Sequence, residues 1–144
     1  MRAVICGTGS AVPDKVLDNE ELSQMVETND EWIRERTGIA QRHIAKEDTC
    51  VSLAVKAAKS ALEQAEIPAE DIDLLIVSTI SSNVVLPCTA CEVQKEIGAV
   101  HAVAYDLSAA CTGFVMAYQS AQSFLQSGIY RTALIIGSEC LSHL

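Results

Sequence analysis

The chain has 144 residues and a formal net charge of −9, with 19 acidic residues against 10 basic ones. Hydrophobic residues make up 49% of it and charged residues 20%, which excludes a disordered chain and supplies enough apolar side chains for a core. The acidic excess argues against general binding to nucleic acid or to a membrane surface. Because no apolar run reaches transmembrane length and no signal peptide is visible, the six cysteines are expected to be reduced thiols in the cytoplasm.

The first third of the sequence predicts one strand and two short helices. Residues 2–7 (RAVICG) form a short apolar run typical of a buried strand, and glycines follow. Asp18 or Asn19 can cap a first helix. A second helix is expected after Thr28, because Thr28 and Glu31 have the spacing of a capping box. The polar stretch that follows predicts a loop or an irregular strand.

From residue 49 onward, the pattern predicts alternating helices and strands. Thr49 or Ser52 can cap the first of these helices, and Thr89 with Glu92 forms a second capping-box pattern. Such alternation indicates an α/β protein with a largely parallel sheet. The expected elements are a helix over 49–64, a strand over 74–80, a helix over 89–97, a strand over 102–107, a helix over 111–127 and a strand over 131–137.

One predicted helix lacks a charged face. No charged residue lies between Asp106 and Arg131. A helix without a charged side is expected to be covered over most of its circumference. The small residues Gly113, Ala117 and Ala121 would let neighbouring backbones approach it closely. We therefore expect this helix to lie between two layers of a larger molecule.

Cys111 is the main candidate for chemistry. It would open the helix that follows a strand, where unpaired N–H groups and the helix dipole favour the nucleophilic thiolate. Such a turn also places the side chain at the carboxyl end of a parallel sheet, where α/β proteins hold active sites. The alternative is a small buried core cysteine, since cysteine is among the most buried residue types. The neighbouring Ala109, Ala110 and Gly113 leave room for a substrate and favour the functional interpretation.

The residues around Cys111, Asp106-Leu107-Ser108-Ala109-Ala110-Cys111-Thr112-Gly113-Phe114, resemble the active-site segment of β-ketoacyl-acyl carrier protein synthase III. The resemblance runs from Arg2 to the end of the chain. It implies an α/β chain over residues 1–144 that forms the N-terminal half of a thiolase-like αβαβα fold, with a mostly parallel mixed sheet and a buried cysteine-bearing helix. It also implies a truncated chain that lacks the C-terminal half. Further matching segments are residues 7–10 with Pro13, residues 28–33 with 36–39 and 42–45, and residues 87–91 with 93–94.

The same resemblance implies roles for individual residues. Cys111 would take an acyl group from acyl-CoA as a thioester, and its own backbone N–H would serve the oxyanion hole. Trp32 would stack on the adenine of CoA, while Thr28 and Arg36 would contact its nucleotide or pantetheine portion. Leu86 corresponds to a position that lines the acyl pocket across the dimer interface and is often aromatic, so the smaller side chain bears on acyl-chain preference.

The reaction implied is the condensation of a short acyl-CoA, such as acetyl-CoA, with malonyl-acyl carrier protein. The product, 3-oxoacyl-acyl carrier protein, initiates fatty-acid biosynthesis. The resemblance implies no metal and no cofactor, because the CoA thioester is a substrate. It implies a cytoplasmic homodimer for the intact enzyme, with neither nucleic acid nor membrane as a partner. The partner histidine and asparagine belong to the second half, so this chain is expected to accept an acyl group without condensing it.

Other patterns point to function less clearly. Gly7-Thr8-Gly9 lacks the third glycine of a dinucleotide-binding loop, and Pro13 blocks a helix start there. Cys88-x-x-Cys91 can indicate zinc or redox chemistry, but no second ligand pair stands at zinc-finger spacing. The resemblance makes Cys91 a packing residue. Structural or surface roles are expected for the remaining candidates, which are His43, His101, His143 and Glu139.

Two alternatives to this function stay open. One is a sister acyltransferase or an enzyme similar to 3-hydroxy-3-methylglutaryl-CoA synthase, which would share the cysteine-bearing helix. The other is a non-catalytic half-domain that binds CoA or a sister chain. The reactivity of Cys111 discriminates between enzyme and module: fast alkylation at neutral pH, suppressed by acyl-CoA, indicates an active nucleophile.

Overall fold

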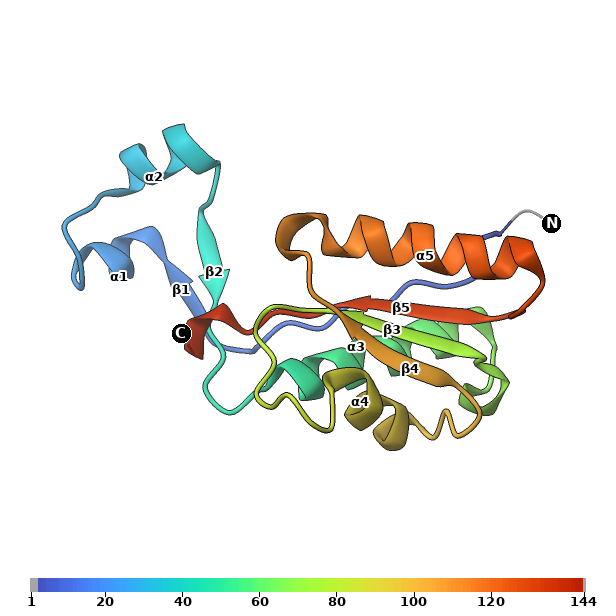
Figure 1. The fold of residues 1–144 in the computed structure, drawn as a ribbon. Helices are drawn as coiled ribbons and strands as arrows, with labels where there is room; N and C mark the ends of the chain where they lie inside the picture. Colours follow the sequence, from blue (N-terminus) through green and yellow to red (C-terminus); the bar gives the residue numbers. More distant parts are fainter. Residues whose placement is uncertain (1–2, 144) are drawn as a thin grey trace. The chain divides into compact units, whose positions relative to one another are not determined.

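The computed structural model describes residues 3–143, and the chain divides into two compact units (Figure 1). Of the described residues, unit 1 comprises 3–11 and 49–141, and unit 2 comprises 12–48 with 142 and 143. None of the helices among residues 3–143 combines the length and the apolar character that crossing a bilayer requires.

The sheet of unit 1 has three parallel strands. Strand β3 (Leu74–Ser78) lies in the middle, between β4 (Val103–Leu107) and β5 (Ala133–Gly137). All five residues of β3 are buried. This burial explains its continuous apolar run, because helices cover both faces of the strand. The three predicted strands from residue 74 onward are confirmed.

Helices cover both faces of this sheet (Figure 1). Leu75 and Val77 face the helices α3 (Cys50–Ala65) and α4 (Thr89–Ile97), whereas Leu74 and Ile76 face α5 (Gly113–Ser127). Successive side chains of a strand point to opposite faces, so one apolar run supplies both cores. Unit 1 is therefore a three-layer αβα arrangement. Its short 3₁₀ turns are Ala69–Asp71 and Ala110–Thr112. A third 3₁₀ turn, Leu141–His143, begins at Leu141, the last residue of unit 1.

The starts of α3 and α4 are capped in different ways. Thr49 caps α3 in a true capping box, in which its hydroxyl accepts from the Ser52 N–H at 3.1 Å and Thr49 N–H donates to the Ser52 hydroxyl at 2.9 Å. The second capping box, predicted for Thr89, is wrong. The Asp106 carboxylate accepts instead from the N–H groups of Thr89 at 2.9 Å and Ala90 at 2.7 Å. A charged acceptor on the neighbouring strand takes the place of the local hydroxyl.

Helix α5 departs from its prediction at its N-terminal end. It begins at Gly113, because the 3₁₀ turn Ala110–Thr112 precedes it, so Cys111 lies in that turn and not in the helix. Only one of its faces is buried in this chain, through Gly113, Ala117 and Ala121. The expected cover on its outer face is absent among residues 3–143, and this face exposes Phe114, Val115, Met116 and Tyr118.

The close packing of α5 depends on glycine. A Cβ atom on Gly113 would overlap the Ser78 hydroxyl at the end of β3. A Cβ atom on Gly137 would lie 3.3 Å from the Phe114 ring, which is a tight contact. The first turn of α5 thus lies directly against the carboxyl ends of β3 and β5.

Unit 2 contains two short helices and a two-stranded antiparallel sheet. Strand β1 (Val16–Asp18) pairs with β2 (Gln41–His43), with Leu17 opposite Arg42. The sheet expected to be mixed is thus two sheets among residues 3–143, one parallel and one antiparallel. The sequence prediction did not include β1, because three residues with alternating burial give too short a pattern.

The helices of unit 2 are α1 (Asn19–Ser23) and α2 (Asp30–Thr37). Asp18 caps α1, as predicted, by accepting from the Glu21 N–H at 2.7 Å. The capping box at Thr28 is wrong, because Asn29 caps α2 and accepts from the Trp32 N–H at 2.8 Å.

The N-terminal strand predicted over residues 2–7 is wrong for the part that is described, residues 3–7. These residues form no strand, and Val4 and Ile5 are 77% and 73% exposed. The segment runs instead along α3, where Cβ atoms on Gly7 and Gly9 would overlap backbone carbonyl oxygens of that helix. Contact with a helix provides no ladder of backbone hydrogen bonds, so the apolar run stays without a strand partner.

Candidate functional site

The candidate site of unit 1 lies at one edge of the parallel sheet. Ser78 on β3 is in register with Leu107 on β4 and Gly137 on β5, so the three strands end together. The loops that leave this edge contain Leu86, Cys111 and Glu139 in turn. Parallel sheets place ligands at this edge.

Cys111 is exposed on a tight turn between β4 and α5. Ala110, just before it, has a φ of +46°, a left-handed conformation that costs energy for a residue with a Cβ atom. Thr112 stabilises the turn, since its N–H and its hydroxyl both donate to the Ala109 carbonyl, at 3.2 and 2.9 Å. The interpretation of Cys111 as a buried core cysteine is wrong for this chain.

The nearest preceding charged residue along the chain, Asp106, is oriented toward α4. Its two carboxylate oxygens accept from the N–H groups of Thr89 and Ala90. Asp106 therefore stabilises the start of α4, and the structure gives it no contact with the Cys111 sulfur.

Glu139 connects the end of β5 to the loop after β3. Its carboxylate accepts from the Ile80 N–H at 3.0 Å, and from the hydroxyls of Thr79 at 3.5 Å and Ser81. The Ser81 hydroxyl also accepts from the Cys140 N–H at 2.8 Å. These contacts confirm a structural role for Glu139. Further along the same loop, Leu86 is 88% exposed in this chain.

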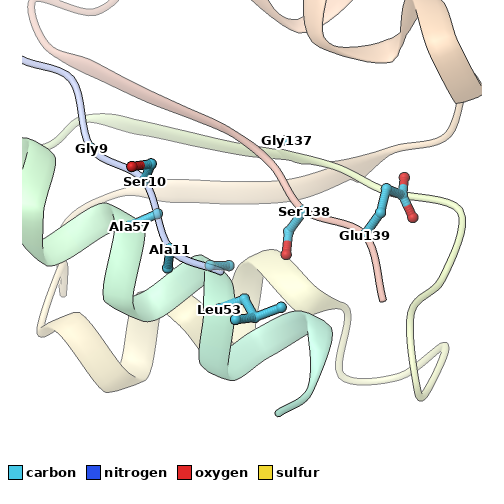
Figure 2. Close-up of a pocket in the computed structure, with 9 residues that line it drawn as sticks. Gly9, Ser10, Ala11, Leu53, Ala57, Gly137, Ser138 and Glu139 are labelled. Atoms are coloured by element: carbon cyan, nitrogen blue, oxygen red, sulfur yellow. The ribbon is translucent and has the colours of Figure 1, made fainter. Parts of the chain in front are cut away.

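A pocket of about 190 Å³ lies between α3 and the end of β5 (Figure 2). The hydroxyl of Ser138 in its wall already donates to the Cys50 carbonyl at 2.8 Å. The lining residues include none of those that the sequence assigns to catalysis or CoA binding. They are Gly9, Ser10, Ala11, Leu53, Ala54, Ala57, Gly137, Ser138 and Glu139.

The residues expected to bind CoA gather around α2 in unit 2. Trp32 is 51% exposed, so it is not a core anchor. The Arg36 guanidinium lies 5.0 Å from the centre of its ring, within cation–π range. The Thr28 hydroxyl, just before the helix, is buried and has no hydrogen-bond partner among the described residues. An aromatic face beside a cation suits a nucleotide that carries phosphate.

A network of polar side chains holds α2 in place within unit 2. The Asn19 amide donates to Asp30 and to the Ile39 carbonyl, both at 2.8 Å, and Arg34 forms an ion pair with Asp30. The hydrogen bond from Asn19 and the contact with Arg34 lower the pKa of Asp30 below its ordinary value. The network fixes the orientation of α2 within unit 2.

The remaining candidates have no arrangement that suits metal binding. His43 contacts the Pro13 carbonyl through Nδ1 at 2.6 Å, and His101 is exposed before β4. The side chain of His143 lies outside the described part. Across residues 3–143, no three side chains of histidine, cysteine, aspartate or glutamate gather as a metal site. The sulfur atoms of Cys88 and Cys91 lie 3.4 Å apart.

The candidate residues thus fall into two groups. Cys111 and Leu86 belong to unit 1, whereas Thr28, Trp32 and Arg36 belong to unit 2.

Comparison with known proteins shows that the chain is similar to members of one family. The family model for 3-oxoacyl-[acyl-carrier-protein] synthase III matches residues 105–144, which include Cys111. A β-ketoacyl-[acyl-carrier-protein] synthase III of Desulfitobacterium hafniense (strain Y51) is 53% identical over 141 residues, covering 97% of this chain and 43% of the relative.

Solved structures agree with this match. The 3-oxoacyl-[acyl-carrier-protein] synthase III of Aquifex aeolicus VF5 has a TM-score of 0.95 and 46% identity, over 96% of this chain and 45% of that one. The enzyme of Pseudomonas aeruginosa PAO1 has a TM-score of 0.93 and 40% identity, over 99% of this chain and 44% of that one. The chain spans less than half the length of these relatives. The fold class expected from the resemblance is confirmed, with this chain matching the N-terminal part.

Proposed function

We propose that this chain, as the N-terminal part of a β-ketoacyl-acyl carrier protein synthase III, accepts a short acyl group from acyl-CoA on Cys111. The observation that carries the proposal is the exposure of Cys111 on a strained turn at the carboxyl edge of the sheet. This turn lies inside the segment that the family model matches. In the complete enzyme, a cytoplasmic homodimer, the acyl group would condense with malonyl-acyl carrier protein to start fatty-acid biosynthesis.

The first half-reaction is acyl transfer to sulfur. The Cys111 thiolate attacks the thioester carbonyl, a carbon–sulfur bond forms, and the bond to CoA breaks so that CoA leaves as a thiolate. The N–H groups of Thr112 and Gly113 donate to the carbonyls of Ala109 and Ala110. The backbone N–H of Cys111 comes before the N–H groups of Thr112 and Gly113 in the chain, so it donates to no carbonyl of the turn. We assign it to the oxyanion of the tetrahedral intermediate. No cofactor is needed, because the CoA thioester is itself the substrate.

CoA binding is assigned to the group around α2. Trp32 offers a half-exposed ring for the adenine, and Arg36 offers a cation for phosphate. The buried Thr28 hydroxyl has an unused hydrogen-bonding capacity within residues 3–143, which suits a contact with the ligand. Leu86 is assigned to the acyl pocket of the complete enzyme.

The direct test is incubation with radiolabelled acetyl-CoA followed by trypsin. Cys111 is the single cysteine of the tryptic peptide 96–131, and Cys6 is the single cysteine of peptide 3–15. We expect label on peptide 96–131 and its loss in Cys111→Ala. Cys6→Ala is the matched control, because Cys6 is also exposed. Equal labelling of the two peptides, or none, contradicts acyl transfer to Cys111.

The second half-reaction supplies a further test. Addition of malonyl-acyl carrier protein to the acylated chain is expected to give no 3-oxoacyl product, because the family's partner histidine and asparagine belong to its second half. Sustained product formation by this chain alone would overturn that expectation. A Cys111 thiol that is inert to both acetyl-CoA and alkylation would favour the non-catalytic half-domain.

CoA binding can be measured without catalysis. Trp32→Ala is expected to weaken CoA binding by isothermal titration calorimetry roughly tenfold, since base–aromatic stacking contributes about 1–3 kcal/mol. Met25→Ala is the matched control, because Met25 is an exposed apolar residue of the same unit. Equal affinities of the Trp32→Ala and Met25→Ala chains would remove Trp32 from the site.

A further inference from the structure

The two sulfur atoms at the start of helix α4 are a feature that the proposed function leaves unused. Cys88 is the N-cap residue of α4 and Cys91 lies in its first turn. Their sulfurs share a hydrogen bond at 3.4 Å. A disulfide bond is about 2.05 Å long, so closure needs an approach of little more than 1 Å.

Both thiols are accessible and both are held in place. Each is partly exposed, and Cys88 also packs against the core cluster beneath α4. Two contacts position the start of the helix. Asp106 accepts from the N–H groups of Thr89 and Ala90, and the Thr89 hydroxyl donates to the Ser82 hydroxyl at 2.9 Å. The backbone between the two cysteines is therefore tied to β4 and to the loop after β3.

The surroundings of Cys91 favour its protonated form. The hydrogen bond with Cys88, together with partial burial and the nearby Asp106 carboxylate, raises the pKa of Cys91. In this hydrogen bond the Cys88 thiol donates to the Cys91 sulfur. No third histidine, cysteine, aspartate or glutamate side chain joins the pair as a metal site within residues 3–143. This arrangement favours thiol–disulfide exchange over metal binding.

We propose that Cys88 and Cys91 form a redox-active dithiol, which a low-molecular-weight disulfide such as oxidised glutathione converts to an intramolecular disulfide. One protein thiolate attacks the oxidant and releases one glutathione thiolate, which leaves a mixed disulfide. The second protein thiolate attacks the protein sulfur of that mixed disulfide and releases the second glutathione. Two protein thiols are oxidised, one glutathione disulfide is reduced to two thiols, and the two protons pass to the released thiolates.

The tryptic map of the chain makes the test unambiguous. Peptide 60–95 contains Cys88 and Cys91 and no other cysteine, and peptide 96–131 contains Cys111 alone. The folded chain is incubated with oxidised glutathione, quenched in acid, alkylated with iodoacetamide and digested. We expect peptide 60–95 to be lighter by two hydrogens and to lack alkyl groups, while peptide 96–131 carries glutathione.

Matched variants distinguish closure of the Cys88–Cys91 disulfide from the addition of glutathione to single thiols. In Cys88→Ser and in Cys91→Ser, the remaining cysteine of peptide 60–95 is expected to carry glutathione. Closure in Cys111→Ala is expected to match that of the parent chain, so the result is independent of acyl transfer. In urea, closure is expected to be several-fold slower, because the fold no longer holds the sulfurs together.

Two results would overturn the proposal. One is recovery of peptide 60–95 with two alkyl groups or two glutathiones from the folded chain, under conditions that modify Cys111. The other is an unchanged rate of closure in urea, which would assign the reaction to the short spacing alone and not to the structure.

Discussion

Gly113 is the residue on which the approach of α5 to the sheet depends most directly. A methyl group there would overlap the Ser78 hydroxyl. We expect Gly113→Ala to lower the free energy of unfolding by about 1–3 kcal/mol, as overpacking does. Urea denaturation followed by circular dichroism measures this change. Ser123→Ala, at an exposed position of the same helix, is the control and is expected to stay within about 0.5 kcal/mol.

The clash between a methyl group at residue 113 and the Ser78 hydroxyl can also be relieved by a change at Ser78. Ser78→Ala removes the hydroxyl that the new methyl group would meet, so the double variant is expected to recover part of the lost stability. Alanine favours a helix over glycine by about 0.8–1.0 kcal/mol. A Gly113→Ala chain that is more stable than the parent by about this amount would therefore show that the turn has room for a side chain.

At the same scale, the behaviour of Cys111 could be predicted only in part from the sequence. Its place after a strand and among small residues predicted a turn at the edge of the sheet, and the structure confirms this. The left-handed Ala110 was not predicted, because alanine has no preference for that conformation. For the same reason, helix α5 begins two residues later than predicted, because the turn that contains Ala110 precedes its first residue.

At the scale of elements, helix α2 is held by a charge network that responds to pH. The Asn19 amide, and then Arg34, lower the pKa of Asp30 below its ordinary value. A lowered carboxyl pKa means that the stabilising contribution is complete above the unfolded pKa and is lost as the pH falls through the folded one. Acidification is therefore expected to loosen the contact between α1 and α2.

NMR titration of the Asp30 carboxyl measures this effect. Asn19→Ala and Arg34→Gln are each expected to raise the pKa of Asp30 toward its ordinary value, because hydrogen bonds from Asn19 and Arg34 lower it. Glu35→Gln is the control, because Glu35 lies on the same helix and has no part in the network shown by the structure. An Asp30 titration that is unchanged in Arg34→Gln and Asn19→Ala would contradict the network.

The elements that the sequence predicted correctly are those with a strong local pattern. The apolar run of β3 and a cap at Thr49 for α3 are local signals, and both are confirmed. The errors occur where a distant partner decides the outcome. Asp106 caps α4 from the neighbouring strand, and residues 3–7 lie along a helix although their composition favours a strand. Neither partner is visible in the local sequence.

At the scale of the whole molecule, the two units differ in the size of their cores. In unit 1 all five residues of β3 are buried between two helical layers. The buried apolar residues of unit 2, within its described part, are Leu17, Ile33 and Ala45. We expect the amides of β3 to be the slowest to exchange with deuterium, and those of α2 to exchange much faster.

Hydrogen–deuterium exchange with mass spectrometry can resolve the two units. Peptides from residues 74–78 are expected to stay protected after peptides from residues 30–37 have exchanged fully. Equal protection of the two sets would show that the units open as one cooperative structure. The result bears on the proposed binding of CoA, because Thr28, Trp32 and Arg36 all belong to unit 2, which is expected to be the less protected unit.

The contacts of Glu139 have a practical consequence for varying the loop that contains Leu86. Glu139 and Ser81 anchor one end of the loop that contains Leu86. Val85 and Leu86, near its other end, are 93% and 88% exposed in this chain. A library that varies these two positions while keeping Ser81 and Glu139 can therefore sample new side chains without dislodging the loop that presents them.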